Sequence, residues 1–347
     1  MGSGKTTSFD IAHRAGVSQA TVSRALRDSP LVNAKTREKV KRIARELNYH
    51  VDRAAAGLRS QQSHTLAVLL FEDPTSDDSQ INPFFLSMLG SITRAAAKRN
   101  YDVLVSFQQL QNDWHLKYQL SNRADGIILL GYGDYQGFAD KIDKLLDANT
   151  RFVVWGATGP ELMDRTIGCD NVGGAFKATS HLLKLGRKNI AFIGGTSDNC
   201  PELKQRYDGY YKALKKAGLQ ADPDLQVDTD FQETSGDLAT EELLNSGKTF
   251  DAIFAASDLL AIGAIKRLRA AGVKVPDDVA VVGFDDIPAA SYFNPSLSTV
   301  QQNTVTAGKH LVNQLIRIIE GKKPKSKRLK PTLMIRGSCG GNPAGTD

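Results

Sequence analysis

The residues with the clearest chemical potential lie near the start of the chain, in the stretch SFDIAHRAGVSQATVSRAL (8–26). On a helix, four polar or basic side chains of this stretch would point outward together: Gln19, Thr21, Ser23 and Arg24. Base edges are read by directional donors and acceptors, and phosphates by cations, so this set suits the major groove of DNA. The alternative is that these side chains only cover the outside of an ordinary pair of helices.

Two short helices must position those side chains. Ser8 is a candidate N-cap for the first helix, and Gly16 sits where a helix must stop and turn. Ser18 can cap the second helix. The apolar residues of the two segments then share inward faces: Ile11, Ala12 and Ala15 in the first, and Val22, Ala25 and Leu26 in the second. Two helices joined by a tight turn with glycine predict a helix-turn-helix.

A third helix follows in the segment NAKTREKVKRIARELNY, for which Asn33 is a candidate N-cap. Its apolar residues follow the i, i+3, i+4, i+7 spacing of one buried face: Val40, Ile43, Ala44 and Leu47. A three-helix unit of this size buries only a small core, so we expect a module rather than a robust domain.

Positive charge is concentrated in this N-terminal region. Residues 1–62 carry 12 Lys/Arg and 5 Asp/Glu, a net charge of +7, whereas the whole chain is +6. The remaining residues therefore sum to about −1. Such an asymmetry indicates a polyanionic partner for the N-terminal region.

The bulk composition fits a small head joined to a large body. The chain has 347 residues, of which 41% are hydrophobic, enough for a globular core. The three cysteines are far apart and predict neither a disulfide framework nor a metal site, which favours a reducing cytoplasm. We find no membrane-spanning run and no secretory signal, and therefore expect a cytoplasmic protein.

No arrangement of residues predicts catalysis. MGSGKTT lacks the full spacing of a phosphate-binding loop, and the glycines of GYGDYQG (131–137) do not match a dinucleotide fingerprint. The six histidines are scattered without metal-ligand spacing, and no nucleophile, base and acid occur together. We therefore expect no enzyme activity, no metal and no cofactor.

From Thr65 onward, short apolar runs alternate with amphipathic helical stretches. The runs are TLAVLLF, DVLVSF, GIILLG, RFVVWG, NIAFIGG, LQVDT, DAIFAA and VAVVGF. Apolar strands separated by helices predict parallel sheets covered on both faces. Eight runs favour two similar doubly wound lobes with a boundary near residues 160–165, and ligands of such sheets bind outside the carboxyl ends of the strands.

In its motifs and their order the chain resembles the LacI/GalR family of transcription regulators. The head carries DIAHRAGVSQATVSRAL and VNAKTREKVKRIARELNY. The body carries NPFF, RADGIILLG, DNVGGAFKATSHLLKLGRKNIAFIGG, RYDGYYKALKKAG, FDAIFAASDLLAIGAIKRLRAAGVKVPDDVAVVGFDD and PSLSTVQQN. The resemblance covers nearly the whole chain. It implies an all-α helix-turn-helix head and an α/β body of two doubly wound parallel-sheet lobes of periplasmic-binding-protein type.

The resemblance also implies domain boundaries, because the family's chain crosses three times between its lobes. The DNA-binding domain would be residues 1–50, and residues 51–62 would be a hinge helix or linker. The first lobe would be 63–163 with 295–328, and the second 164–294 with 329–347.

Carried over residue by residue, the recognition helix starts at Ser18. Gln19, Ala20 and Arg24 match base-reading positions, and glutamine and arginine can bind adenine and guanine through two hydrogen bonds. Ser18, Thr21 and Ser23 would contact phosphates. In segment 51–60, Leu58 matches a leucine that opens a central step in the minor groove. Ala55 matches the small residue at which two hinge helices pack, and Arg59 would influence the central base pair. Val51 stands where the family usually has proline, and a flexible linker is the alternative.

The resemblance further implies an effector pocket between the lobes. Phe84 and Phe85 match lining residues of the first lobe, and Trp155 and Phe231 match aromatic positions that cover a ring-shaped ligand. Arg206 and Asp285 match polar anchors, and Asp258 a further polar contact. Aromatic faces with charged hydrogen-bonding groups suit a sugar. Two alternatives stay open: Arg206 and Asp285 pair with each other, and Asp170 either lines the cleft or caps a helix.

These implications predict a ligand-responsive transcription regulator, a homodimeric repressor of a carbohydrate-use operon that binds palindromic double-stranded DNA and is released by a small sugar. The chain around Cys200 differs from purine-binding relatives, which favours a neutral ligand. A co-repressor or non-sugar effector is the alternative. A sugar-binding protein without DNA function is more remote, because the basic head opposes it.

Overall fold

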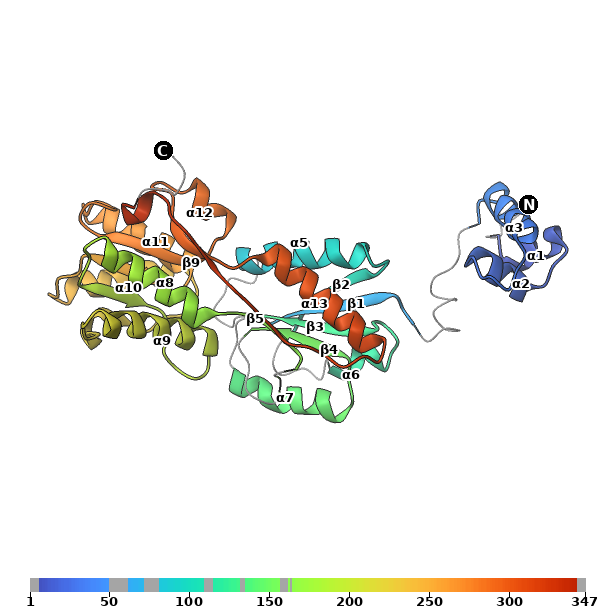
Figure 1. Cartoon of the computed structure of the whole chain (residues 1–347), viewed down its shortest axis with the longest axis horizontal. Helices are drawn as coiled ribbons and strands as arrows, with labels where there is room; N and C mark the ends of the chain where they lie inside the picture. The colour runs from blue at the N-terminus through green and yellow to red at the C-terminus, as the bar shows by residue number, and fades with distance from the viewer. Residues whose placement is uncertain are drawn as a thin grey trace. The chain divides into compact units, whose positions relative to one another are not determined.

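The computed structural model of the chain describes residues 6–49, 62–71, 81–108, 115–131, 135–156, 162 and 164–341. The chain divides into two compact units, residues 1–63 and 64–347, which we call the head and the body. Each is described by itself (Figure 1). The segments that carry Ala55, Leu58 and Arg59 lie outside the described residues.

The head contains three helices: α1 (Ser8–Ala15), α2 (Gln19–Leu26) and α3 (Ala34–Glu46). Gly16 ends α1 in the left-handed conformation with φ 68°, and Ser18 caps α2, as the sequence predicts. Asn33 caps α3 through a hydrogen bond from the Thr36 N–H at 2.8 Å. The helix-turn-helix prediction is therefore confirmed.

The N-cap of α1 differs from the prediction, because it is Thr7 and not Ser8. The Thr7 hydroxyl accepts from the Asp10 N–H, and the Asp10 carboxylate accepts from the Thr7 N–H at 2.8 Å. This reciprocal capping box needs a carboxylate or amide three residues after the cap. Thr7 has Asp10 at that position, whereas Ser8 has Ile11.

The three helices of the head share one small apolar core. Ile11, Val22 and Val40 each come from a different helix and are completely buried. Val17, Leu26, Leu47 and Tyr49 pack at the margin of this core. Because the core is small, the head depends on each of these contacts.

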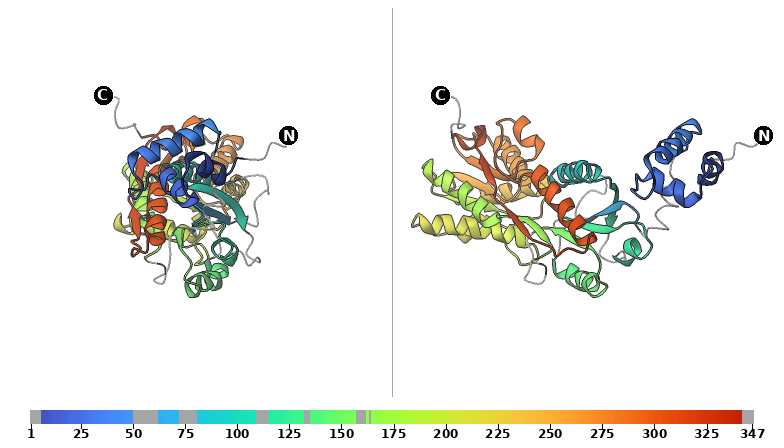
Figure 2. Two further views of the ribbon diagram at one scale, coloured as in Figure 1. Left: turned by 90° about the vertical axis from the view of Figure 1, so that its right-hand side faces the viewer. Right: turned by 45° about the vertical axis from the view of Figure 1, so that its right-hand side comes forward.

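The body is built on two six-stranded sheets, one in each lobe (Figures 1 and 2). The first sheet has the order β11-β5-β4-β3-β1-β2, and all its strands are parallel. Its strands are β1 (Thr65–Phe71), β2 (Asp102–Gln108), β3 (Gly126–Leu130), β4 (Phe152–Trp155), β5 (Thr166–Cys169) and β11 (Lys327–Leu329). Helices α5 (Pro83–Ala97) and α13 (Thr304–Ile319) cover one face, and α6 (His115–Gln119) and α7 (Tyr135–Asp147) the other.

The second sheet has the order β12-β10-β9-β8-β6-β7, in which only β12 runs antiparallel to its neighbour. Its strands are β6 (Ile190–Ile193), β7 (Gln226–Val227), β8 (Ala252–Ala255), β9 (Ala280–Asp285), β10 (Ser298–Gln301) and β12 (Thr332–Met334). The accompanying helices are α8 (Asn171–Lys184), α9 (Pro201–Lys216), α10 (Glu233–Asn245), α11 (Asp258–Ala270) and α12 (Pro288–Tyr292), with short 3₁₀ turns at Pro223–Leu225 and Gly337–Cys339. Two doubly wound lobes with mostly parallel sheets are thus confirmed.

The chain changes sheet three times, each time a few residues later than the predicted domain boundaries. β5 (Thr166–Cys169) still belongs to the first sheet, and β10 (Ser298–Gln301) still belongs to the second. The last change falls between β11 and β12. The strands β5, β10, β11 and β12 have three or four residues that include polar or basic side chains, so they do not form the apolar runs that locate a strand in a sequence.

No helix among the described residues is long and apolar enough to cross a membrane.

Candidate functional site

The outward face of α2 presents the predicted base-reading side chains. Gln19, Ala20 and Arg24 are exposed, and Thr21 and Ser23 are half-buried. Arg24 has no ion-pair partner among the described residues, so its guanidinium is available for a ligand. The first turn of α2 also presents backbone N–H groups, which favour anions such as phosphate.

The hydroxyls of this helix already take part in local hydrogen bonds. Ser18 Oγ accepts from the Thr21 N–H at 3.2 Å and lies 2.9 Å from Thr21 Oγ1. Arg27 Nη2 donates to Ser23 Oγ at 2.8 Å. One of the Ser18 and Thr21 hydroxyls donates its proton to the other. The accepting hydroxyl of that pair and the Ser23 hydroxyl keep a donor for phosphate oxygens, and the helix fixes their orientation.

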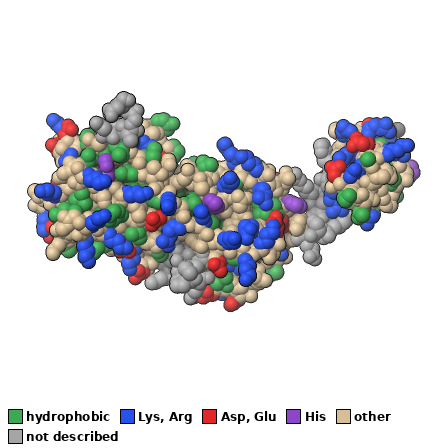
Figure 3. Space-filling model, in the orientation of Figure 1, with side chains coloured by type: hydrophobic (Ala, Val, Ile, Leu, Met, Phe, Trp, Pro, Cys, Tyr) green, Lys and Arg blue, Asp and Glu red, His purple; other side chains and the backbone are tan. Residues whose placement is uncertain are grey.

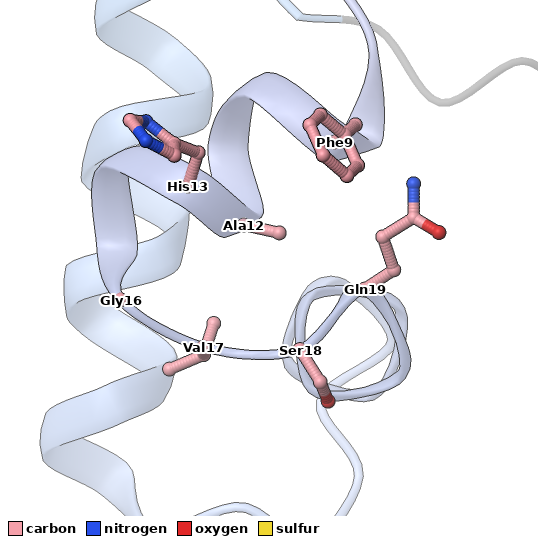
Figure 4. Close-up of a pocket in the computed structure, with 7 residues that line it drawn as sticks. All are labelled: Phe9, Ala12, His13, Gly16, Val17, Ser18 and Gln19. Atoms are coloured by element: carbon pink, nitrogen blue, oxygen red, sulfur yellow. The ribbon is translucent and has the colours of Figure 1, made fainter.

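A shallow depression lies beside the turn of the helix-turn-helix (Figure 4). Phe9, Ala12 and His13 of α1 form one side of it, and the turn residues with Gln19 form the other. The Phe9 side chain is 65% exposed, although it is large and apolar. Phe9 was not among the residues predicted from the sequence. The sequence signal that could have identified Phe9 is a large apolar residue outside the buried stripe of α1, which is formed by Ile11, Ala12 and Ala15. In the structure Phe9 lies on the same side of the head as Gln19 (Figure 4).

The acidic groups of the head are mostly engaged within it. Asp28 accepts from Lys41 Nζ, which lowers the pKa of that carboxyl below its ordinary value. Glu46 lies 3.3 Å from Arg14 Nη2, and hydrogen bonds from Thr7 lower the pKa of Asp10. The carboxylates therefore neutralise particular neighbours and leave exposed cations such as Arg24 to face a polyanion.

In the body, three predicted aromatic side chains come together at the carboxyl ends of first-lobe strands. Phe84 and Phe85 begin α5, and Trp155 ends β4. The ring centroid of Phe84 lies 5.3 Å from that of Phe85 and 6.0 Å from that of Trp155. The structure thus forms an aromatic cluster at the edge of the sheet where ligands bind in this class of fold.

In the second lobe, the Arg206 guanidinium is completely buried in a network of polar groups. Its Nη2 lies 3.4 Å from Asp285 Oδ1, its Nε donates to Asn171 Oδ1 at 3.1 Å, and its Nη1 donates to the Ala256 carbonyl. The guanidinium carbon also lies 4.0 Å from the centroid of the Phe284 ring. Arg206 and Asp285 therefore pair with each other in this structure, the alternative that the sequence left open.

The carboxyl end of β9 has a strained backbone. Asp285 and Asp286 have φ values of 119° and 57°, a region that residues with a side chain rarely adopt. Gln302 Nε2 donates to Asp285 Oδ1 at 2.7 Å. Arg336 Nη2 and Gln301 Nε2 each donate to Asp286 at 2.7 Å. These contacts hold the strained turn and fix the direction of the Asp285 carboxylate.

Asp258 is placed differently from the other predicted anchors. Its side chain is completely buried, accepts from the Ile287 N–H at 2.8 Å and from the Thr299 hydroxyl, and so joins elements within the second lobe. Burial, and then the nearby Asp285, raise the pKa of Asp258 well above its ordinary value. Phe231 is partly buried and packs at the margin of the body's main apolar core.

Two polar residues of the network were not predicted: Asn171 and Gln302. Gln302 directly follows β10, and Asn171 is the second residue after β5, so their position at the carboxyl end of a strand is the signal that could have identified them. Asp170, for which two roles were open, accepts from the Gly173 N–H at 3.1 Å and is the N-cap of α8. The described residues contain no group of three or more possible metal ligands.

Comparison with protein families gives two matches. Residues 9–52 match the model described as bacterial regulatory proteins, lacI family. Residues 179–339 match a periplasmic binding protein-like domain. The first match covers the helix-turn-helix, and the second covers most of the second lobe together with α13.

Relatives of similar length match the chain from end to end. It is 33% identical over 336 residues to the HTH-type transcriptional regulator CelR of Thermobifida fusca, with 94% of this chain and 96% of that protein covered. It is 31% identical over 337 residues to the HTH-type transcriptional repressor CytR of Escherichia coli K12, with 96% of each covered. Another relative, 30% identical, is the ribose operon repressor of the same strain, with 96% of this chain and 99% of that protein covered.

Solved structures agree with these relatives. A lac repressor dimer bound to operator and the anti-inducer ONPF matches with a TM-score of 0.81 at 26% identity, over 96% of this chain and 99% of that one. A CelR–cellobiose complex matches with a TM-score of 0.71 at 32% identity and the same coverage. The chain belongs to the LacI family. It is a DNA-binding transcriptional regulator with a helix-turn-helix head and a periplasmic-binding-protein-like body.

Proposed function

We propose that this regulator is a homodimeric repressor of carbohydrate-use genes, released from a palindromic operator by a sugar in the cleft between its lobes. The observation that carries the effector class is the polar network at Arg206 and Asp285, together with the aromatic cluster at Phe84. A sugar ring offers apolar C–H faces for aromatic side chains, and hydroxyls for a guanidinium and a carboxylate.

In this proposal the sugar competes with the contact between Arg206 and Asp285. The 3.4 Å separation of Nη2 and Oδ1 is longer than a strong charged hydrogen bond, which is about 2.7–2.9 Å. A pair of vicinal hydroxyls could bridge the two groups while Asn171 and Gln302 continue to hold them. The ligand would then find both anchors already oriented and would spend little of its binding free energy on ordering them.

The names of two similar proteins support a carbohydrate. One matching structure is a complex of CelR with cellobiose, and one relative is a ribose operon repressor. These ligands belong to those proteins. For this chain the aromatic cluster favours a ring-shaped neutral ligand, and a co-repressor role is the alternative.

The proposed DNA interface consists of the α2 face and the segment that follows the head. Gln19, Ala20 and Arg24 would read bases, and Ser18, Thr21 and Ser23 would bind phosphates. Ala55, Leu58 and Arg59 would act in the minor groove at the operator centre. The protein would act as a non-catalytic switch in the cytoplasm, where its DNA lies.

Two measurements test this proposal. First, the wild-type protein is used to select duplexes from a random-sequence library, and we expect a palindrome with a site for each head of a dimer. Second, a thermal-shift panel of mono- and disaccharides, sugar phosphates and purines is followed by release of the selected duplex. A micromolar ligand at millimolar concentration should add about 4 kcal/mol of stability.

The outcomes separate the alternatives. A sugar that stabilises the protein and releases the duplex supports the proposal, whereas a sugar that tightens binding makes it a co-repressor. A hit only among purines contradicts the sugar assignment. Sugar binding without any selected duplex would favour a sugar-binding protein that has no DNA function.

A further inference from the structure

The chain segments that precede the six strands of the first sheet all lie at one end of the first lobe. All six strands of the first sheet are parallel, so their amino ends meet at one edge. β1, with which the described part of the body begins, starts at this edge, next to His64. β11 starts there as well, after the connection 320–326 that follows α13. This end of the lobe is therefore the end at which the chain arrives from the head.

Charge within the body is strongly segregated toward this connection. Residues 304–330 carry eight Lys/Arg and one Glu, a net charge of +7. Residues 63–347 together sum to −1, so the rest of the body carries −8. The net charge of the body is therefore close to zero only because the basic segment 304–330 offsets the acidic remainder.

Other connections at the same end add further cations. The residues just before each strand, together with its first residue, include nine Lys or Arg and four Asp or Glu. The basic set, which we call the basic end, consists of Lys98, Arg99, Arg123, Arg151, Arg165, Lys322, Lys323, Lys325 and Lys327. Lys and Arg side chains gather over α13 and the segment that follows it (Figure 3).

Two of the four acidic residues at this end, Asp125 and Glu320, have partners within the lobe. Asp125 accepts from the His64 N–H at 3.0 Å. Glu320 pairs with Lys322 at 2.5 Å and with Arg99 at 4.0 Å. By contrast, Lys323, Lys325 and Lys327 are exposed and have no ion-pair partner among the residues that the structure describes. The basic end thus presents an excess of positive charge to solvent.

The composition of the connection indicates what kind of partner it fits. The run GKKPKSKR (321–328) contains no aromatic side chain and, apart from proline, no apolar one. Protein–protein interfaces depend on buried aromatic and aliphatic anchors, whereas phosphate backbones are bound mainly by exposed cations. A nucleic acid backbone therefore fits this surface better than an acidic protein.

The length of the connection to the head places DNA within reach. Residues 50–63 separate the last described residue of the head's fold from His64. Fourteen residues span at most about 50 Å when fully extended. Once the head binds DNA, the same duplex is held at high effective concentration near the basic end.

We propose that the basic end of the body binds the phosphate backbone of the same DNA duplex that the head reads. The contact is electrostatic and independent of sequence, and it adds affinity without changing which sequence is chosen. This inference rests on the proposed function, because it takes DNA to be the ligand of the head.

The test neutralises three exposed lysines in the full-length protein. The triple variant Lys323→Gln, Lys325→Gln, Lys327→Gln is compared with the control triple variant Lys184→Gln, Lys212→Gln, Lys215→Gln. The control removes the same charge from exposed positions on α8 and α9 in the second lobe. Binding is measured between 50 and 200 mM KCl with a duplex selected by the wild-type protein and with an unselected duplex of equal length.

We expect the plot of log affinity against log salt to become shallower by about 0.9 for each phosphate that the variant no longer neutralises. That amounts to as much as about 5 for the six lysines of a dimer. Affinity at low salt should fall on the order of tenfold or more for both duplexes, so that their affinity ratio is kept. The control variant should keep the wild-type slope.

Three outcomes would overturn the inference. The first is a triple variant with the wild-type salt slope. This result would mean that the surface does not bind DNA, and an acidic protein would be the favoured partner. The second is a lower melting temperature with an unchanged slope, which would mean that the lysines only complement the carboxyl end of α13. The third is an equal decrease of slope in the control variant.

Failure of the proposed function is distinguishable from failure of this inference. A wild-type protein that selects no sequence contradicts the repressor function. The unselected duplex still reports on the basic end in that case. A wild-type protein that binds neither duplex contradicts both.

Discussion

The predicted DNA-reading face of the head and the polar network of the body differ in how far their side chains are exposed to solvent. On α2 the predicted contact residues Gln19 and Arg24 are exposed, and Arg24 has no ion-pair partner among the described residues. In the body Arg206 and Asp285 are buried and contact each other, with Asn171 and Gln302 beside them. Side chains that bind a large rigid polymer such as DNA can stay solvated until it binds. The side chains of a small-ligand site are held in their binding orientation by contacts with one another.

This difference predicts where each site is sensitive to mutation. Changes on α2 should weaken binding and leave the fold intact. Changes in the buried network should affect folding and binding together, because removal of one partner leaves the other charge without compensation. The following substitutions test that contrast, from the largest expected effect to the smallest.

Arg206→Ala should have the largest effect. It leaves Asp285 buried without its guanidinium partner, and we expect a loss of about 3–5 kcal/mol in the stability of the body. Calorimetry should show a lower melting temperature for the body, and the effector response should disappear. Lys204→Ala on the same helix removes an exposed ion pair with Asp198 and is the control, expected to cost less than about 1 kcal/mol. A body with wild-type stability in Arg206→Ala would contradict the buried network.

Ile11→Ala should unfold the head without affecting the body. Ile11 is completely buried in the small apolar core of the head, and such truncations cost about 2–5 kcal/mol. Circular dichroism and operator binding should both show the loss, while the melting temperature and sugar binding of the body stay unchanged. A common shift of both transitions would mean that the two units do not fold independently.

Arg24→Ala should weaken specific DNA binding and leave stability unchanged. Removing a bidentate hydrogen-bonded pair with a base costs about 1–3 kcal/mol of discrimination. Competition between the selected duplex and single-base variants of it would locate the base that is read. Lys39→Ala removes an exposed cation from α3 and serves as the control for charge alone. Equal losses of affinity for the two variants, with discrimination kept, would make Arg24 a phosphate-binding residue.

The pH dependence of the head should be the smallest effect. Hydrogen bonds from Thr7 lower the pKa of Asp10, so the folded head prefers the ionised form. This stabilisation is present above about pH 4, the ordinary value, and is lost as the pH falls through the lowered pKa. Asp10→Asn keeps an amide acceptor for the Thr7 N–H but removes the charge. It should therefore lower the melting temperature of the head slightly at pH 7, and the difference should shrink as the pH falls through the lowered pKa. A difference that stays constant across that range would exclude the ionised carboxylate as its cause.

Much of the fold could be predicted because local signals determine it. Gly16, Ser18 and Asn33 stand where caps are needed, and the continuous apolar runs of β1 and β3 favour buried strands. The predicted N-cap at Ser8 was wrong, because Ser8 lacks the acidic partner that Thr7 has in Asp10. The predicted points where the chain changes sheet were displaced, because the short strands next to them, such as β5 and β11, include polar or basic residues and form no apolar run.

The site was harder to predict where its residues act through one another. Arg206 and Asp285 were predicted as anchors, and their mutual contact was left open because 79 positions separate them in the chain. Asn171 and Gln302 escaped prediction since an amide after a strand has many uses. The roles of Phe231 and Asp258 as effector contacts, and of all the DNA contacts, stay predictions.

The strained turn at the end of β9 has a mechanical consequence. Asp285 is bonded to Gln302, and Asp286 to Gln301 and Arg336. Gln301 and Gln302 come just before the second passage of the chain between the lobes, and Arg336 follows the third passage. The turn is therefore hydrogen-bonded to residues next to two of the three connections between the lobes. A ligand that displaces the Asp285 carboxylate would also displace these hydrogen-bonded residues, and the displacement would reach the connections between the lobes through the backbone.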